Sequence, residues 1–299
     1  MSLLKSAATV SGLTLVSRIT GVIRDMLIAR YFGAGAETDA FYVAFRLPNM
    51  LRRLFAEGAF QQAFVPMLSD VRETSSRERS KAFVDHVFTV LAAAVLLASV
   101  LGVLLSPLLV WAIASGMRED PAAYTLAVGL TRVMFPYIAF MSLVALAASV
   151  LNTLKHFAVP AFTPVLLNLS FIAATLFLAP MLEEPIWALA AGVMAGGVLQ
   201  LMVQVIALRR LSVKLRPRGW RESIGDEAVR RVLKLMVPAL FGVGVAQLSI
   251  LINTNIASWL GAGAVTWLNY ADRLMEFPTA LLGVALGTVM LPGLSAAHA

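Results

Sequence analysis

Arginine recurs inside apolar stretches of this chain that are long enough to cross a membrane. An arginine at the centre of a membrane helix costs roughly 2.5–3.5 kcal/mol even on a lenient insertion scale. A guanidinium in that position needs a carboxylate, a polar cavity or an anionic ligand, and it binds phosphate groups through paired hydrogen bonds. The arginines in question are Arg18, Arg24, Arg46, Arg52, Arg53 and Arg273.

Two interpretations of these arginines remain open. Ion pairing along one helix would join Arg18 to Asp25, Arg46 to Asp39 and Arg53 to Glu57, while Asp272 and Glu276 flank Arg273. Such pairs would form a purely structural network. Asp39 and Asp272, however, are expected near helix ends, whereas Arg18 and Arg52 are expected deeper in the membrane. This mismatch favours a water-filled cationic cavity over the structural network.

Composition shows which elements must position these side chains. Hydrophobic residues make up 59% of the chain and charged residues 14%, against about 45–50% and 25% in soluble domains. Residues 86–117, 133–154 and 157–182 contain no Lys, Arg, Asp or Glu, and each run exceeds the roughly 20 residues that span a bilayer. We therefore predict an all-α, polytopic membrane bundle. Its eight transmembrane helices are expected at 5–31, 36–69, 83–114, 122–152, 160–179, 187–210, 228–258 and 265–293.

The loop charges predict orientation and domains. Loops on one side carry Lys5, Lys155 and the basic segments 72–81 and 209–231, whereas the other side carries only Arg118 among acidic residues. The positive-inside rule then places the N-terminus in the cytoplasm. We predict a six-helix lobe at 1–210, a basic cytoplasmic connection at 211–231 and the two-helix start of a second lobe at 232–299, an arrangement typical of transporters built from repeats. The connection is expected to lie on the membrane surface.

Motifs for enzymatic or metal chemistry are missing from the sequence. The chain has no cysteine, and its three histidines, His86, His156 and His298, are scattered, so no metal-ligand spacing arises. Neither a nucleophile elbow nor a phosphate-binding loop occurs. The net charge of +7 resides largely in loops, which is typical of membrane topology and does not indicate nucleic-acid binding. We expect a transporter with no cofactor, no metal and no enzymatic activity.

Several long motifs resemble those of one family. They are SRITGVIRD at 17–25, TDAF at 38–41, FRLPN at 45–49, RRLFAEGA at 52–59, NYADRLMEFP at 269–278 and LGVALGT at 282–288. Together they resemble the MurJ (MviN) family of lipid II flippases, within the MOP exporter superfamily. The resemblance implies transport of lipid II, an undecaprenyl-pyrophosphate-linked peptidoglycan precursor, from the cytoplasmic to the periplasmic leaflet of the bacterial inner membrane.

The resemblance also implies roles for individual residues. It assigns substrate binding to Arg18, Arg24, Arg52 and Arg273. It assigns supporting or gating roles to Ser17, Asp25, Asp39, Arg53, Glu57, Asp272 and Glu276.

In one respect the sequence departs from the family. Members usually have fourteen helices and about 500 residues, so a chain of eight helices is expected to be a fragment or a truncated product. An exporter of another lipid-linked polysaccharide unit or of drugs, and a non-transporting membrane fragment, remain as alternatives. The binding partners expected are lipid II and membrane lipids, and the sequence gives no oligomeric state.

Overall fold

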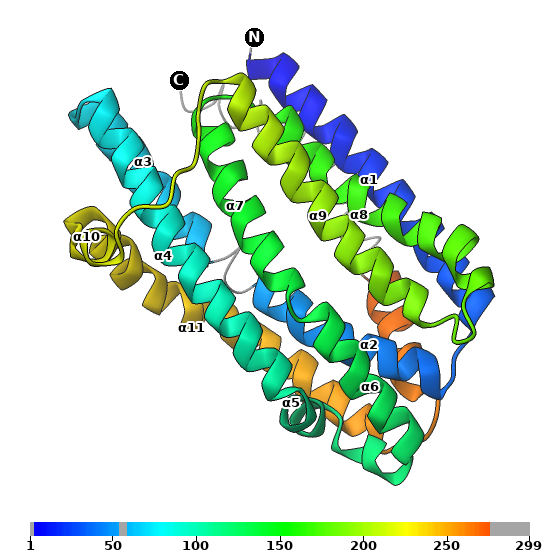
Figure 1. Ribbon diagram of the computed structural model, residues 1–299. Coiled ribbons are helices and arrows are strands. Elements are labelled where there is room, and N and C mark those ends of the chain that lie inside the picture. Colours follow the sequence, from blue (N-terminus) through cyan, green and yellow to red (C-terminus); the bar gives the residue numbers. More distant parts are fainter. Residues whose placement is uncertain (1–2, 54–58, 276–299) are drawn as a thin grey trace, which may run out of the picture.

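The computed structural model describes residues 3–53 and 59–275, and these residues form a bundle of helices without strands. Figure 1 shows the helices running along one long axis. Eleven of the helical elements are α-helices with the following bounds: α1 (Leu3–Phe32), α2 (Ala36–Leu51), α3 (Phe60–Thr74), α4 (Arg77–Leu104), α5 (Ser106–Ile113), α6 (Pro121–Met134), α7 (Tyr137–Thr153), α8 (Ala158–Ala173), α9 (Trp187–Arg210), α10 (Trp220–Gly225) and α11 (Glu227–Ser258). Residues 264–275 form a further helical segment, called here the 264–275 helix.

Proline divides several of the predicted spans. The stretch predicted at 83–114 is broken at Leu105, and Pro107 stands in the first turn of α5. The stretch predicted at 122–152 is broken at Pro136, between α6 and α7. Proline lacks an N–H and clashes with the carbonyl four residues before it, so it favours such breaks. The stretch predicted at 36–69 appears as α2 and α3 on either side of residues 54–58, which lie outside the described residues.

The described helices include several that fit a bilayer. Four helical stretches are long and apolar enough to cross a membrane, namely 77–104, 121–153, 158–181 and 187–210, and α11 adds a fifth if its two halves, bent by 47°, form one span. The prediction of an all-α membrane bundle is confirmed. The count of eight spans stays a prediction, because α1 and α2 carry more charge than a simple apolar span does and residues 276–293 of the eighth predicted span lie outside the described residues.

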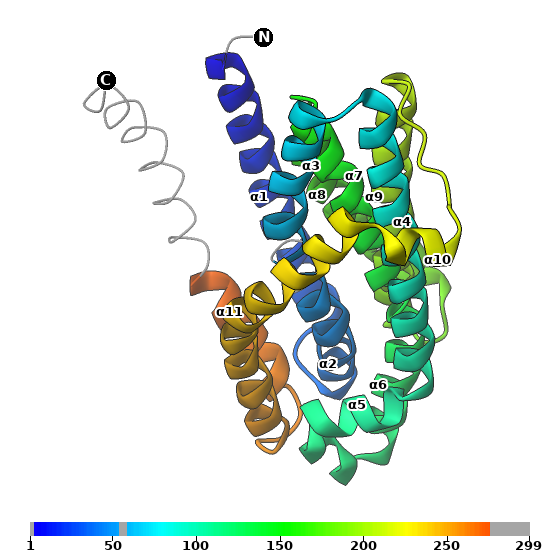
Figure 2. The same cartoon turned by 90° about the vertical axis from the view of Figure 1, so that its left-hand side faces the viewer.

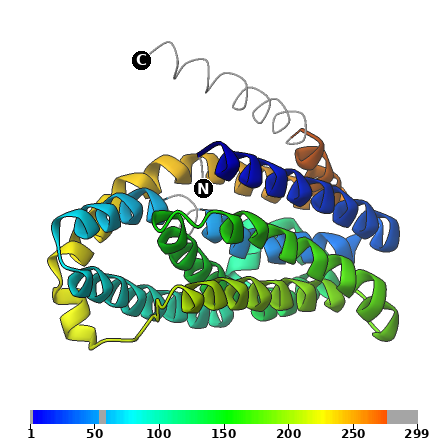
Figure 3. The same cartoon turned by 90° about the horizontal axis from the view of Figure 1, so that it is seen from above.

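Helix α2 lies between α11 and the 264–275 helix on one side and α4, α5 and α6 on the other (Figure 2). α1 packs along α8, α8 along α9, and α9 against α7, while α2 packs against α6. Figure 3 shows α1 and the 264–275 helix on one side of the bundle and α4 and α9 on the opposite side. The charged residues of α2 therefore lie between other helices of the predicted first lobe and the start of the predicted second lobe (Figure 2).

Buried aromatic and aliphatic side chains hold this arrangement together. Phe41 on α2 and Tyr137 on α7 belong to one core that also contains Leu130 and Met134 of α6. A second core joins α3, α4 and α7 near the segments 72–81 and 209–231, which together are called the basic end here. Phe41 and Phe171 of the first core also line the charged cavity described next, so the packing of this core fixes one wall of the cavity.

Candidate functional site

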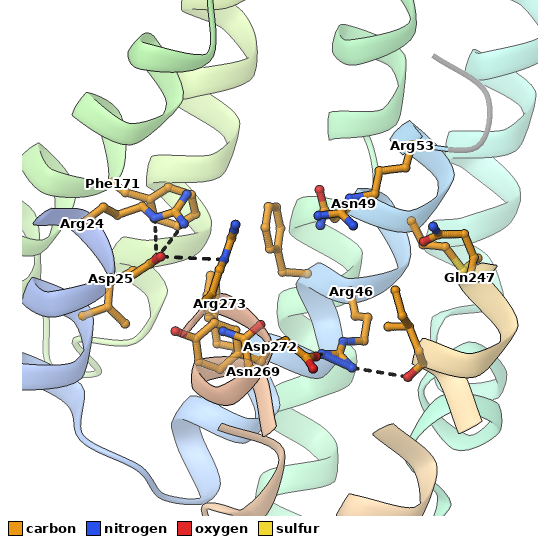
Figure 4. A pocket seen from close by; sticks show the side chains of 16 residues that line it. Arg24, Asp25, Arg46, Asn49, Arg53, Phe171, Gln247, Asn269, Asp272 and Arg273 are labelled. Atoms are coloured by element: carbon orange, nitrogen blue, oxygen red, sulfur yellow. Dashed lines mark hydrogen bonds and ion pairs between the residues drawn. The ribbon is translucent and has the colours of Figure 1, made fainter. Parts of the chain in front are cut away.

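Arg24 and Asp25, adjacent residues of α1, form an ion-pair cluster with Arg273 of the 264–275 helix (Figure 4). Arg24 Nη2 lies 2.6 Å from Asp25 Oδ1, and Arg24 Nε donates to the same oxygen at 2.8 Å. The second carboxylate oxygen, Oδ2, lies 3.7 Å from Arg273 Nε. One carboxylate thus bridges two guanidinium groups, and these three residues together carry one net positive charge.

Two residues of α8 hold the Arg24 side chain from its other side. Arg24 Nη1 donates a hydrogen bond of 3.0 Å to Asn168 Oδ1, and the guanidinium carbon lies 5.3 Å from the centre of the Phe171 ring, within cation–π distance. Asn168 Nδ2 donates in turn to the Ser17 carbonyl at 2.9 Å. Arg24 is only 8% exposed, so these contacts replace water around its charge and fix its direction.

Arg46 forms a second cluster between α2, α11 and the 264–275 helix. Its Nη1 donates to the Thr254 hydroxyl and, at 3.3 Å, to the Ile250 carbonyl. Its Nη2 lies 3.6 Å from Asp272 Oδ2. The carboxylate near Arg46 is therefore Asp272, and the pairing with Asp39 that the spacing on α2 suggested is wrong. The structure brings in a carboxylate from a distant part of the chain, which spacing on one helix does not reveal.

A cavity of about 90 Å³ lies between the two clusters. Its walls come from α1, α2, α8, α11 and the 264–275 helix, and Figure 4 shows their side chains converging. This volume holds only a few water molecules. Among the described residues its charged lining consists of four arginines and two aspartates, so two positive charges exceed the negative ones. These residues are Arg24, Arg46, Arg53, Arg273, Asp25 and Asp272.

Two of the four arginines predicted to bind substrate line the cavity, and the other two do not. Arg24 and Arg273 line the cavity, whereas Arg52 lies beside it and donates to Asn49 Oδ1 at 3.1 and 3.0 Å from Nε and Nη2. Arg18 is exposed on α1 and is not among the lining residues. The roles that the resemblance gives to these four residues stay predictions.

Some of the residues predicted to have supporting or gating roles also line the cavity, and others lie outside it. Asp25, Arg53 and Asp272 line the cavity, and Ser17 contributes its carbonyl to Asn168. Asp39 is buried and lies outside the lining, where its carboxylate accepts hydrogen bonds from the first turn of the 264–275 helix. Glu57 and Glu276 lie outside the described residues.

The sequence patterns did not assign the neutral polar residues of the site. Asn49, Gln247 and Asn269 line the cavity, and Asn168 supports it from behind. An amide side chain in an apolar helix costs less than a charge, so it stands out weakly in a hydropathy pattern. Within the described segments no group of three His, Cys, Asp or Glu residues is placed to hold a metal ion.

Known proteins resemble this chain in sequence and in fold. The sequence model of the family described as lipid II flippase MurJ matches residues 28–299. The chain is 57% identical over its whole length to lipid II flippase MurJ of Burkholderia cenocepacia and spans 58% of that protein. It is 42% identical to the probable lipid II flippase MurJ of Haemophilus influenzae, over 96% of this chain and 57% of the relative.

A solved structure shares the fold. Lipid II flippase MurJ in an inward closed conformation matches with a TM-score of 0.79 at 29% identity, over 94% of this chain and 57% of that chain. The chain therefore spans less than two thirds of the length of these relatives. The family match covers far more than half of the chain and confirms the resemblance seen in the motifs. This chain belongs to the lipid II flippase MurJ family.

Proposed function

We propose that this chain provides the headgroup-binding cavity of a lipid II flippase in the bacterial inner membrane. The observation that carries the proposal is that Arg24 and Arg273 meet at one cavity, each beside an oxygen of Asp25. Guanidinium groups bind phosphate oxygens through paired hydrogen bonds, so an anionic ligand fits this pair of arginines. Lipid II supplies such an anion in its pyrophosphate, and the names of the related proteins support this substrate.

Asp25 acts as the internal counter-ion in this proposal. It holds Arg24 and Arg273 on its two oxygens when no substrate is bound. A pyrophosphate carries more negative charge than one carboxylate and accepts the paired N–H groups of each guanidinium. It would displace Asp25 from part of this network and draw α1 and the 264–275 helix toward itself. Arg18 and Arg52 would meet the headgroup on its way to or from the cavity.

Transport would follow from the position of the cavity between two lobes. Residues 1–210 would form one lobe, and residues from 232 onward would begin the other, with 211–231 as a cytoplasmic connection. Transporters built in this way open a midplane site to one side at a time. The positive loops favour a cytoplasmic N-terminus and hence a cytoplasmic basic end. The cavity of about 90 Å³ is too small for a lipid-linked headgroup, so binding would require the lobes to move apart.

A reconstituted assay tests the proposal. Vesicles containing lipid II and the intact protein would be probed for headgroup accessibility from the outside over time. Arg24→Ala should abolish exchange of the headgroup between leaflets, and Arg24→Lys should restore part of it, because lysine keeps the charge but loses the paired geometry. Arg30→Ala is the matched control, since Arg30 lies on the same helix but is exposed and outside the cavity lining.

The outcomes separate the alternatives. Normal exchange by Arg24→Ala would contradict a cationic headgroup site. Exchange of other lipid-linked sugars at the same rate as lipid II would favour a broader polysaccharide exporter. Protein abundance in the vesicles must be equal among variants, so that loss of folding is not taken for loss of transport.

A further inference from the structure

A second and larger cavity lies on the outer side of the bundle, with a volume of about 620 Å³. This volume falls within the range of about 300–1,000 Å³ that small-molecule sites occupy. Leu143 of α7, Phe88 of α4 and Leu201 and Val205 of α9 form its apolar walls, and residues 213–216 border it at the basic end. We call it the outer groove. It shares no lining residue with the charged cavity.

The chain reaches over the groove because of how α9 ends. Ser212 adopts a left-handed conformation with φ of 60°. Val213 N donates to the Leu208 carbonyl at 2.9 Å and Ser212 N to the Arg209 carbonyl at 3.0 Å, the hydrogen-bond pattern of a Schellman motif. This turn reverses the chain at the end of α9 and sends it toward α10, past α7 (Figure 1).

The other end of this connection is fastened to α4. Arg216 N donates to Asp85 Oδ1 at 3.0 Å, and Arg218 N donates to the Thr89 hydroxyl at 2.9 Å. Asp85 is 1% exposed, and its other oxygen lies 3.5 Å from Arg218 Nε. Because both ends are held by hydrogen bonds, the segment 213–216 forms a fixed border of the groove.

Three cations surround this border. Arg209, Lys214 and Arg216 line the groove and are exposed. Within the described part of the chain, none of these three side chains has a hydrogen bond or an ion pair, in contrast to Arg218 with its Asp85 partner. The groove lining contains no Asp or Glu. An apolar slot therefore ends at a group of cations that the protein itself does not neutralise.

The residues around the outer groove indicate which ligand fits an apolar slot that ends at cations. Met202 and Ile206 lie beside the groove on α9 and are 47% and 42% exposed, as expected for a helix face in contact with lipid tails. The cations stand at the end of the same helix, where headgroups begin. A soluble anion would need no apolar slot, and a neutral lipid would leave the cations unmatched.

We propose that the outer groove binds one anionic phospholipid. One acyl chain lies along Leu143, Leu201 and Val205, and the phosphodiester lies among Arg209, Lys214 and Arg216. The site tethers the connection between the two predicted lobes to the surrounding leaflet. It is separate from the site proposed for lipid II and does not depend on that assignment.

Photo-cross-linking of the intact protein tests the proposal. The probe is phosphatidylglycerol with a diazirine near the middle of one acyl chain, in phosphatidylcholine vesicles, and labelled peptides are mapped by mass spectrometry. We expect labelling at Leu143, Leu201 or Val205 that a phosphatidylcholine probe with the same acyl chain does not give. Equal labelling by both probes would overturn the headgroup assignment.

Charge variants test the cations. The triple substitution of Arg209, Lys214 and Arg216 by Gln should weaken phosphatidylglycerol labelling on the order of a hundredfold, or about fivefold for each cation. The matched control replaces Arg77, Lys81 and Arg231 by Gln, which removes three exposed charges from the same end outside the groove. An equal loss in the control would show general surface attraction and overturn a defined site.

Filling the slot tests its apolar part. Val205→Trp should block labelling while leaving all three cations in place, and Ile206→Trp, one position along α9 and outside the lining, should not. Unchanged labelling in Val205→Trp would contradict the proposed chain position. Displacement of the probe by a polyprenyl diphosphate at lower concentration than by phosphatidylglycerol would assign the groove to a different lipid and overturn the proposal.

Discussion

Asp39 accepts a hydrogen bond of 2.7 Å from the backbone N–H of Thr266 and another of 2.6 Å from the Thr266 hydroxyl, although 227 positions separate them. A third hydrogen bond comes from the backbone N–H of Gly263 at 2.6 Å. Asp39 lies in the first turn of α2 and caps the first turn of the 264–275 helix. Its buried carboxylate is thus stabilised by two helix N-termini, pairs with no cation among the described residues, and joins the first predicted lobe to the start of the second.

Asp39→Ala should destabilise this junction by about 1.5–3 kcal/mol, the usual value of hydrogen bonds to a charged group. Thermal unfolding in detergent would measure the loss. Thr266→Val keeps the shape of the side chain but removes the hydroxyl, so it should cost less. The double variant should lose less than the two single losses added together, because both act on one contact. Additive losses would show that Asp39 does not act through Thr266.

Gly116 provides a second junction, at the end of the bundle opposite the basic end. A Cβ on Gly116 would lie 2.4 Å from the Ser258 carbonyl oxygen, and Gly116 N already donates to the Ser258 hydroxyl at 3.1 Å. Gly116→Ala should therefore force α11 away from residues 115–119. We expect lower thermal stability, by about 1–3 kcal/mol as for other overpacked sites, and faster labelling of a cysteine at Ser258.

Gly242→Ala is the matched control for this prediction. Gly242 lies in α11 itself, and nothing lies within 4 Å of a Cβ built there. Alanine has the higher helix propensity, by about 1 kcal/mol, so this change should preserve or raise stability. Equal destabilisation by both variants would mean that the steric contact with Ser258 is not the cause.

Sequence patterns predicted the helical class and part of the charged site for a clear physical reason. Charge within an apolar run is rare, so Arg24 and Arg273 are conspicuous in the sequence, and the structure places both at one cavity. The carboxylate that they share was harder to predict from the sequence, because the pairing of Arg273 with Asp25 is set by tertiary packing. Arg18 is equally conspicuous but points outward on the same helix, since hydropathy gives depth along a helix and only weakly its rotation.

Single-cysteine labelling tests the proposed orientation on a chain that has no native cysteine. Cysteine at Trp220, exposed at the start of α10, should react only with a reagent that enters the cytoplasm. Cysteine at Glu183, in the turn between α8 and α9, should react with an impermeant reagent from the periplasm. The reverse pattern would invert the topology and contradict the positive-inside prediction.

The link between α4 and α11 gives a prediction about acid pH. Arg79 donates to Asp226 Oδ2 at 2.5 Å and to Oδ1 at 3.1 Å, and Asp226 also caps α11 at the N–H of Ala228. Burial raises the pKa of the Asp226 carboxyl, but the hydrogen bonds from Arg79 and the backbone outweigh burial and hold this pKa below its ordinary value. The ionised form is therefore favoured by folding.

A carboxyl whose pKa is lowered on folding contributes stability above its ordinary pKa, near 3.9, and loses it as pH falls through the lowered value. We expect the α4–α11 link to be constant from pH 8 to 5 and to weaken below about pH 4. Asp226→Asn keeps a capping oxygen and should cost at most about 1 kcal/mol, because Arg79 is 42% exposed and solvent screens the pair. Asp226→Ala also loses the cap and should cost about 1 kcal/mol more.

Hydrogen exchange of residues 220–232, read by mass spectrometry between pH 7 and pH 3.5 after correction for intrinsic rates, would measure this link. His86 Nε2 lies 3.9 Å from Asp226 Oδ2 and 3.6 Å from Glu222 Oε1, so the variants are compared in a His86→Gln background, which removes this neighbouring imidazole. In that background the acid-induced rise in exchange should vanish in Asp226→Asn, which has no proton to gain. A rise of the same size in Asp226→Asn would assign the acid response to another carboxyl at the basic end.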